Sequence, residues 1–125
     1  CNGRIIMDKF IYVGIGGAIG AILRYGISCL PIKNDFPILT LITNMLGALL
    51  IGIVVGLAER ENISSSMTLF LKTGVCGGFT TFSTFSLEAM NLMDMGKYGV
   101  SLLYIGLSVM GCLIGVWLGK QIIRL

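Results

Sequence analysis

The chain has 125 residues, of which 55% are hydrophobic and only 12% are charged, and its mean hydropathy is +0.93. A soluble domain usually carries about twice that charged fraction, and a core of this size could not bury so much apolar surface. The composition therefore excludes a soluble domain and predicts several helices that span a membrane. The net charge of +3 is scattered, without the basic run that would indicate nucleic-acid binding.

The cysteines do not indicate a metal or redox site. Cys1, Cys29, Cys76 and Cys112 form no Cys-x-x-Cys pair, and the sequence contains no histidine. We therefore expect no zinc site, and we expect the last three cysteines to act as small apolar residues within helices. Residues 1–8 are expected to form a short cytoplasmic lead-in. The first apolar run continues into a spanning helix and so does not resemble a cleavable signal peptide.

The first predicted span covers about residues 9–30. Gly16, Gly20 and Arg24 recur every four residues, which places them on one face of the helix. Small residues on one face allow helices in a membrane to approach closely. Pro31 and Pro37 then enclose a short loop, because proline interrupts a helix.

Three more spans are predicted at about residues 38–58, 67–92 and 98–120, separated by short polar turns. The third is interrupted near its middle by Gly77–Gly78, where each glycine costs a helix about 1 kcal/mol. The fourth carries a polar stripe at helical spacing, made of Ser101, Tyr104, Ser108 and Cys112. The sequence thus predicts an all-α membrane protein, a single domain of four transmembrane helices with the third helix broken near its middle.

Four spans would place both termini on one side of the membrane, and the basic residues are divided unequally between the two sides. The side of the termini would carry Arg4, Lys9, Arg60, Lys72, Lys120 and Arg124, and the other side Arg24, Lys33 and Lys97. The positive-inside rule then favours termini in the cytoplasm. Several of these charges lie within spans or at their ends, so insertion in both orientations stays open.

Arg24 and Asn44 are polar residues inside apolar spans, and each has two interpretations. Arg24 is either a snorkelling residue with its head at the interface or a vestibule cation that raises the local anion concentration. Asn44 either makes a structural hydrogen bond between helices or donates its amide N–H groups to a passing anion.

The run Gly-Gly-Phe-Thr-Thr-Phe-Ser-Thr-Phe-Ser at residues 77–86 is too polar for a helix that only faces lipid. Phe82 and Phe85 share a helix face among hydroxyl groups. Such a pair is usually part of a core, but rings presented edge-on can also attract an anion. A break at Gly77–Gly78 would free backbone carbonyls, which can bind a cation such as Na⁺. Glu88 is either solvated at the far end of this helix or paired with a cation of a neighbouring helix.

The residues themselves leave two other functions open. A small multidrug-type proton-coupled transporter needs a membrane-buried carboxylate in the first span, where this chain has Arg24. A non-transporting membrane assembly subunit would use the hydroxyl groups only to join helices. Catalysis is not expected, because there is no nucleophile–base pair and no phosphate-binding loop.

The run at residues 77–86, together with Asn44 in the second span and Arg24 in the first, resembles the CrcB/Fluc family of fluoride channels. The resemblance covers essentially the whole chain in length, number of spans and order of motifs. It implies a fluoride-selective channel that lets fluoride leave the cell passively and so gives resistance to fluoride toxicity. It also implies a multi-pass protein of a prokaryotic plasma membrane that forms a dual-topology antiparallel homodimer.

The resemblance further implies which residues act. The fluoride pathway would be formed by Asn44, Phe82, Phe85, Ser83, Thr84, Tyr104, Ser108 and Arg24. Backbone carbonyls of Gly77 and Thr80 from both subunits would hold one structural Na⁺ at the dimer centre. The chain departs from the family at Cys112, where the polar track of the fourth helix would continue with a hydroxyl. A thiol is a poorer donor, so the track is expected to be weaker there.

Overall fold

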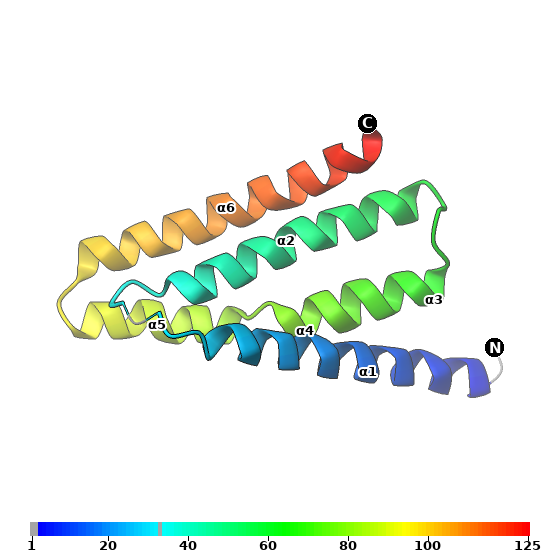
Figure 1. The fold of residues 1–125 in the computed structure, drawn as a ribbon, viewed down its shortest axis with the longest axis horizontal. Coiled ribbons are helices and arrows are strands. Elements are labelled where there is room, and N and C mark those ends of the chain that lie inside the picture. The colour runs from blue at the N-terminus through cyan, green and yellow to red at the C-terminus, as the bar shows by residue number, and fades with distance from the viewer. Residues whose placement is uncertain (1–2, 33) are drawn as a thin grey trace.

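The computed structural model describes residues 3–32 and 34–125, so Cys1 and Lys33 lie outside the described residues. Its regular elements are all helical (Figure 1): α1 (Gly3–Ser28), α2 (Ile38–Glu59), α3 (Ser65–Thr68), the π-helical η1 (Leu69–Cys76), α4 (Gly77–Phe79), α5 (Phe82–Asp94) and α6 (Tyr98–Arg124). The elements α3, η1 and α4 follow one another directly, so residues 65–79 form one helical segment. The prediction of an all-α protein is confirmed.

Three of these helices, α1, α2 and α6, are long and apolar enough to cross a membrane. They overlap the predicted spans at 9–30, 38–58 and 98–120. Helix α1 begins earlier than predicted, at Gly3, so most of the expected lead-in is helical. The predicted span at 67–92 is divided between the segment 65–79 and α5, and each piece alone is shorter than a usual span.

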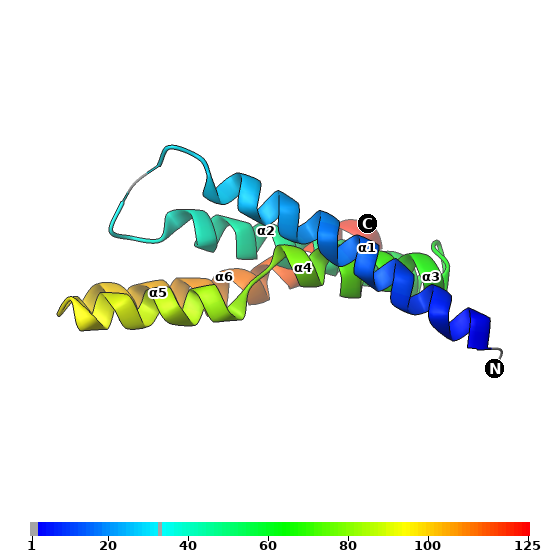
Figure 2. The ribbon, with the colours of Figure 1, turned by 90° about the horizontal axis from the view of Figure 1, so that it is seen from below.

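Helix α1 packs across η1 and α4, and α2 packs along α6 (Figures 1 and 2). Glycines make both contacts close. A Cβ atom at Gly20 would lie 2.1 Å from the carbonyl oxygen of Val75, and one at Gly52 would lie 2.3 Å from that of Val116. Gly20 and Gly52 therefore join helices within one chain, since no larger side chain fits between these backbones.

A buried apolar cluster fixes α5 between α2 and α6. It consists of Leu41, Ala89, Leu92 and Tyr104. Ser101 of α6 reinforces this contact, because its buried hydroxyl donates a hydrogen bond of 2.8 Å to the carbonyl of Ala89. The position of α5 is therefore set by packing on both neighbouring helices.

The turns follow their sequence signals. Ser64 caps α3, accepting a hydrogen bond of 3.1 Å from the backbone N–H of Met67. Gly96, between α5 and α6, has a φ of +78°, a left-handed conformation that favours glycine. Next to it, Lys97 forms an ion pair with Asp35 of the loop between α1 and α2. This ammonium group holds the pKa of the Asp35 carboxyl below its usual value.

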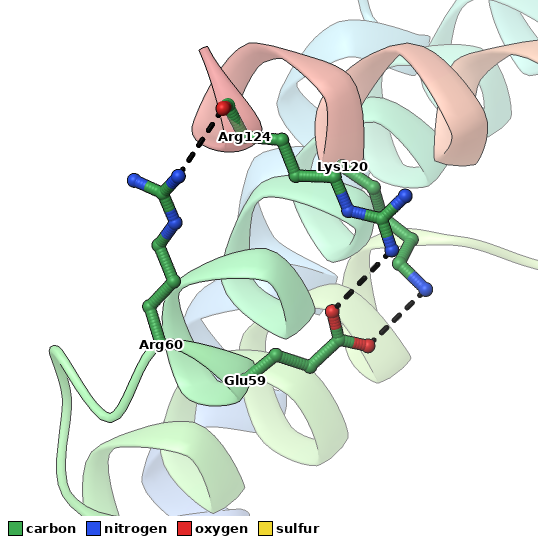
Figure 3. Close-up of polar contacts among 4 residues, drawn as sticks. All are labelled: Glu59, Arg60, Lys120 and Arg124. Carbon is green, nitrogen blue, oxygen red and sulfur yellow. Dashed lines mark hydrogen bonds and ion pairs between the residues drawn. The ribbon is translucent and has the colours of Figure 1, made fainter.

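Charged side chains join the C-terminal ends of α2 and α6 (Figure 3). Glu59 contacts both Lys120, at 3.2 Å, and Arg124, at 3.8 Å between nitrogen and oxygen. Arg60 donates a hydrogen bond of 3.1 Å to the backbone oxygen of Arg124. Because these groups are at least partly exposed, each pair contributes about 1 kcal/mol at most. The start of α1 lies at the same end of the molecule (Figure 1).

Candidate functional site

The helical break lies at Thr80 and Thr81, whose backbone is extended, with φ and ψ of −87° and 157° and of −147° and 123°. The sequence predicted the break at Gly77–Gly78, and this position is wrong, because both glycines are helical. Gly78 serves packing instead: a Cβ atom there would lie 2.3 Å from the carbonyl oxygen of Gly17 on α1. Helix α5 begins anew where the Thr81 side chain accepts a hydrogen bond from the N–H of Thr84.

Asn44 of α2 holds the break by both ends of its amide. Its Oδ1 accepts a hydrogen bond of 2.8 Å from the N–H of Thr81, and its Nδ2 donates one of 3.1 Å to the carbonyl of the same residue. The interpretation of Asn44 as a structural bridge between helices is therefore supported. A carboxamide carries two N–H donors, so this bridge leaves one of them for another acceptor.

Arg24 of α1 reaches the other side of the break. Its Nε donates a hydrogen bond of 3.2 Å to the carbonyl of Gly78, and the side chain is partly buried. The guanidinium thus has a protein partner, and both interpretations of Arg24, as a snorkelling residue and as a vestibule cation, stay predictions. The break is thus contacted by two polar side chains, Arg24 of α1 at Gly78 before it and Asn44 of α2 at Thr81 within it.

The phenylalanines begin a series of rings that runs from α5 to α6. The ring centroids of Phe82 and Phe85 are 5.6 Å apart, and those of Phe85 and Tyr104 are 5.2 Å apart. Phe36, in the loop before α2, meets Tyr104 edge-on at 5.6 Å. Phe82 is 78% exposed, whereas Tyr104 is completely buried. The prediction that Phe82 and Phe85 share a face is confirmed.

Two hydroxyl groups near this series have no hydrogen-bond partner among the described residues: Oη of Tyr104 and Oγ of Ser108. Both atoms are buried. A buried polar group without a partner costs about 1–3 kcal/mol, and such groups are rare in native structures. These two hydroxyls are therefore candidates to donate to a ligand.

A groove of about 460 Å³ brings much of the predicted site together, and we call it the central groove. The described residues that line it carry no charge. Its polar and aromatic lining is Asn44, Thr80, Thr81, Ser108, Phe82 and Phe85, with Cys76, Gly77 and Cys112 beside them. Ser83 and Thr84 do not belong to this lining. Ser83 Oγ lies 3.3 Å from Thr81 Oγ1, and the backbone N–H of Thr84 donates to the same oxygen. Arg24 lies on the α1 side of the break.

The predicted cation ligands lie where the break releases backbone carbonyls. In an α-helix each carbonyl accepts a hydrogen bond from the N–H of the residue four positions later in the chain. For Gly77 that donor is the N–H of Thr81, which goes to Asn44. For Thr80 it is the N–H of Thr84, which goes to the Thr81 side chain. Gly77 and Thr80 have therefore lost their helical donors. Among the described residues, no group of three metal-binding side chains is present.

Residues 11–120 match the family described as "CrcB-like protein, Camphor Resistance (CrcB)". The chain belongs to the CrcB family. A relative from Ruminiclostridium cellulolyticum is 47% identical over 124 residues, covering 94% of each chain, and is named a fluoride-specific ion channel, FluC. Relatives with the same name come from Azobacteroides pseudotrichonymphae, 41% identical over 118 residues, and Methanococcus aeolicus, 42% identical over 115 residues. Each of these two alignments covers 91% of this chain and 94% of the relative.

The resemblance to the CrcB/Fluc family is thereby confirmed, and the chain is a multi-pass membrane protein. Its relatives in the CrcB family are named as channels and not as enzymes. Neither the proton-coupled transporter nor the assembly subunit is favoured by these relatives.

Two contacts of this CrcB chain were not predicted from its sequence. Phe36 covers Tyr104, and the Thr40 hydroxyl donates a hydrogen bond of 2.6 Å to Oε1 of Glu88. The involvement of Thr40 in a contact between helices could have been predicted, because Thr40 shares a helix face with Asn44. Glu88 is thus held by α2 and pairs with no cation among the residues that the structure describes. Phe36 carried no such signal, since its contact joins a loop to a helix distant in sequence.

Proposed function

We propose that this chain is a fluoride-selective channel through which fluoride leaves the cell passively, giving resistance to fluoride toxicity, in a prokaryotic plasma membrane. One observation carries the proposal: the buried hydroxyls of Tyr104 and Ser108 have no partner among the described residues, and Ser108 lines an uncharged groove. Fluoride is small and strongly hydrated, so a selective path must replace its water with hydrogen-bond donors. The names of the relatives support the same ion.

The fluoride path would use donors that do not trap the ion with a full charge. The hydroxyls of Tyr104 and Ser108, the remaining amide N–H of Asn44 and the edges of Phe82 and Phe85 are such donors. Four of the predicted residues do not line the central groove: Ser83, Thr84, Arg24 and Tyr104. The first three would act nearer its entrances, and Tyr104 would act from its contact with Phe85. The Cys112 thiol lines the groove and offers a weaker donor than a hydroxyl.

The functional unit would be an antiparallel homodimer of dual topology with two fluoride pathways. The central groove is open, and Phe82 is 78% exposed although threonine and serine surround it. A second copy that covers this face would close the groove and give Phe82 a partner. The segment 65–79 and α5 would together form the fourth crossing of each chain.

The dimer would be held by one structural Na⁺. Carbonyls of Gly77 and Thr80 have lost their helical donors, and both residues line the open groove. Carbonyl oxygens of a broken helix suit Na⁺. Two copies related by a twofold axis would supply four such oxygens to one ion.

The test is fluoride efflux from liposomes that contain the purified protein, followed with a fluoride electrode while chloride efflux is measured in parallel. We expect fast fluoride efflux with chloride retained. The double variant Phe82→Ile, Phe85→Ile should lose most of this flux, whereas Phe10→Ile, a change on the exposed face of α1, should keep it. Chloride flux comparable to that of fluoride would refute the proposal, as would full activity of the double variant.

A further inference from the structure

The break leaves four carbonyls without their helical donors, those of Gly77, Gly78, Phe79 and Thr80. Among the described side chains, only Arg24 supplies a replacement, to Gly78. The helical donor of Gly78 would be the N–H of Phe82. The extended backbone of Thr80 and Thr81 separates this N–H, at the start of α5, from the Gly78 carbonyl. Nε of Arg24 takes its place, at 3.2 Å. The carbonyls of Gly77 and Thr80 receive no such donor among the side-chain contacts of the described residues.

The approach of Arg24 is fixed by close backbone packing. On the same face of α1, a Cβ atom at Gly20 would lie 2.7 Å from the nitrogen of Phe79 and 3.1 Å from the carbonyl carbon of Gly78. The helix backbone therefore cannot shift without losing this contact. A cation is also favourable at this position, because the C-terminal end of a helix carries partial negative charge.

Gly77 and Gly78 are adjacent but lie on different sides of the segment. Gly77 lines the central groove. Gly78 instead faces α1, where a Cβ atom would lie 2.3 Å from the carbonyl oxygen of Gly17. Arg24 thus contacts the segment from α1, whereas the proposed cation would approach from the groove.

We propose that Arg24 is a positioning residue that caps the Gly78 carbonyl and thereby fixes which carbonyls of the break are left for the cation. With Gly78 bonded to Arg24, the end of α4 is held and Gly77 and Thr80 keep their orientation. The effect on the cation rests on the proposed Na⁺ site, but the hydrogen bond to Gly78 does not.

Two substitutions separate a directed hydrogen bond from a simple positive charge. In Arg24→Gln the amide nitrogen is separated from Cβ by the same number of bonds as Nε of arginine, so a donor stays in place and the charge is lost. In Arg24→Lys the charge stays and a methylene group replaces Nε. Lys9→Gln, elsewhere on α1, controls for the loss of one positive charge.

Two peptide bonds of unique sequence allow the test to be read by NMR in detergent micelles. Gly78–Phe79 is the only Gly-Phe pair of the chain, and Thr80–Thr81 the only Thr-Thr pair. Carbonyl-¹³C glycine with ¹⁵N phenylalanine therefore gives one cross-peak, which reports the Gly78 carbonyl. Carbonyl-¹³C and ¹⁵N threonine likewise report the Thr80 carbonyl, which is titrated with Na⁺ against a K⁺ control.

We expect the Gly78 signal of Arg24→Gln to stay close to that of the native chain, and the signal of Arg24→Lys to move upfield, as a carbonyl does when it loses a hydrogen bond. The Na⁺ midpoint at Thr80 should rise about tenfold in Arg24→Lys, the equivalent of one hydrogen bond of about 1.4 kcal/mol. In Arg24→Gln and Lys9→Gln it should change less than about twofold.

If the Gly78 signal of Arg24→Lys stays close to that of the native chain while the signal of Arg24→Gln moves, the inference is overturned, because charge alone would then explain Arg24. Unchanged Gly78 signals in both variants would also overturn it. If Na⁺ moves no signal of the native chain at Thr80, the proposed cation site fails, and the Gly78 signals still decide the role of Arg24.

Discussion

Ser101 and Ser108 form a matched pair for testing whether the unpartnered hydroxyls belong to an ion path. Both lie on one stripe of α6 and both are buried. The hydroxyl of Ser101 donates to the carbonyl of Ala89 at 2.8 Å, whereas that of Ser108 has no partner among the described residues. The substitution of each by alanine removes the same atom from two different environments.

The two variants should change stability and flux in opposite ways. Ser101→Ala loses a buried hydrogen bond and should lower the free energy of unfolding by about 1 kcal/mol. Ser108→Ala loses no hydrogen bond in the empty chain, so its stability should be unchanged or raised by up to about 1 kcal/mol. A hydrogen bond to an ion contributes about 1.5–3 kcal/mol, so fluoride flux through Ser108→Ala should fall about tenfold to a hundredfold. Ser101→Ala should keep its flux.

The assay combines unfolding in detergent, followed by the fluorescence of the single tryptophan, Trp117, with fluoride-electrode efflux from liposomes. Flux is compared at equal amounts of inserted protein. Equal destabilisation by the two variants would refute the reasoning, because the hydroxyl of Ser108 would then have a structural partner. Unchanged flux in Ser108→Ala would remove this residue from the proposed path.

Three further substitutions test other parts of the structure. Gly78→Ala should lower the unfolding midpoint, because its Cβ would lie 2.3 Å from a carbonyl oxygen of α1. Gly106→Ala is the control: a Cβ there has no atom within 4 Å, so the midpoint should stay unchanged or rise. Equal midpoints in the two variants would contradict the packing described. Asn44→Asp should reduce fluoride flux at neutral pH by about tenfold or more, because a carboxylate cannot donate to the break or to an anion; native flux measured with the electrode would count against this. The pKa of Asp35 is lowered by Lys97, so the pair stabilises the fold above the unfolded pKa of about 3.9, and this contribution is lost as pH falls through the lower folded value. Unfolding midpoints of Asp35→Asn should therefore depend less on pH below about 4, and parallel pH profiles would disprove the effect.

Hydropathy and turn residues were sufficient for most of the helices. The predicted spans at 38–58 and 98–120 agree closely with Ile38–Glu59 and Tyr98–Arg124. In a membrane, helices must satisfy their own backbone, so a long apolar run has few alternatives to a helix. The same argument fails for the third segment, whose polar residues take part in contacts with other helices.

The position of the break shows why local signals were not enough. Gly77 and Gly78 have low helix propensity, which pointed to an interruption there. Their backbone is nevertheless helical, and Gly78 is used for close contact with α1. The interruption occurs at Thr80 and Thr81, where Asn44, 37 residues away in sequence, replaces the helical hydrogen bonds of Thr81.

The sequence by itself determined that the chain is a helical membrane protein, where most helices begin and end, and which family it resembles. Those features depend on composition, periodicity and a continuous motif. Only the tertiary structure decided which polar groups are satisfied. Ser101 and Ser108 occupy equivalent places in the stripe of α6, but only Ser101 lies opposite an accepting carbonyl, that of Ala89 on α5. A hydrogen bond needs a partner on a neighbouring helix, and helix packing alone determines where that partner lies.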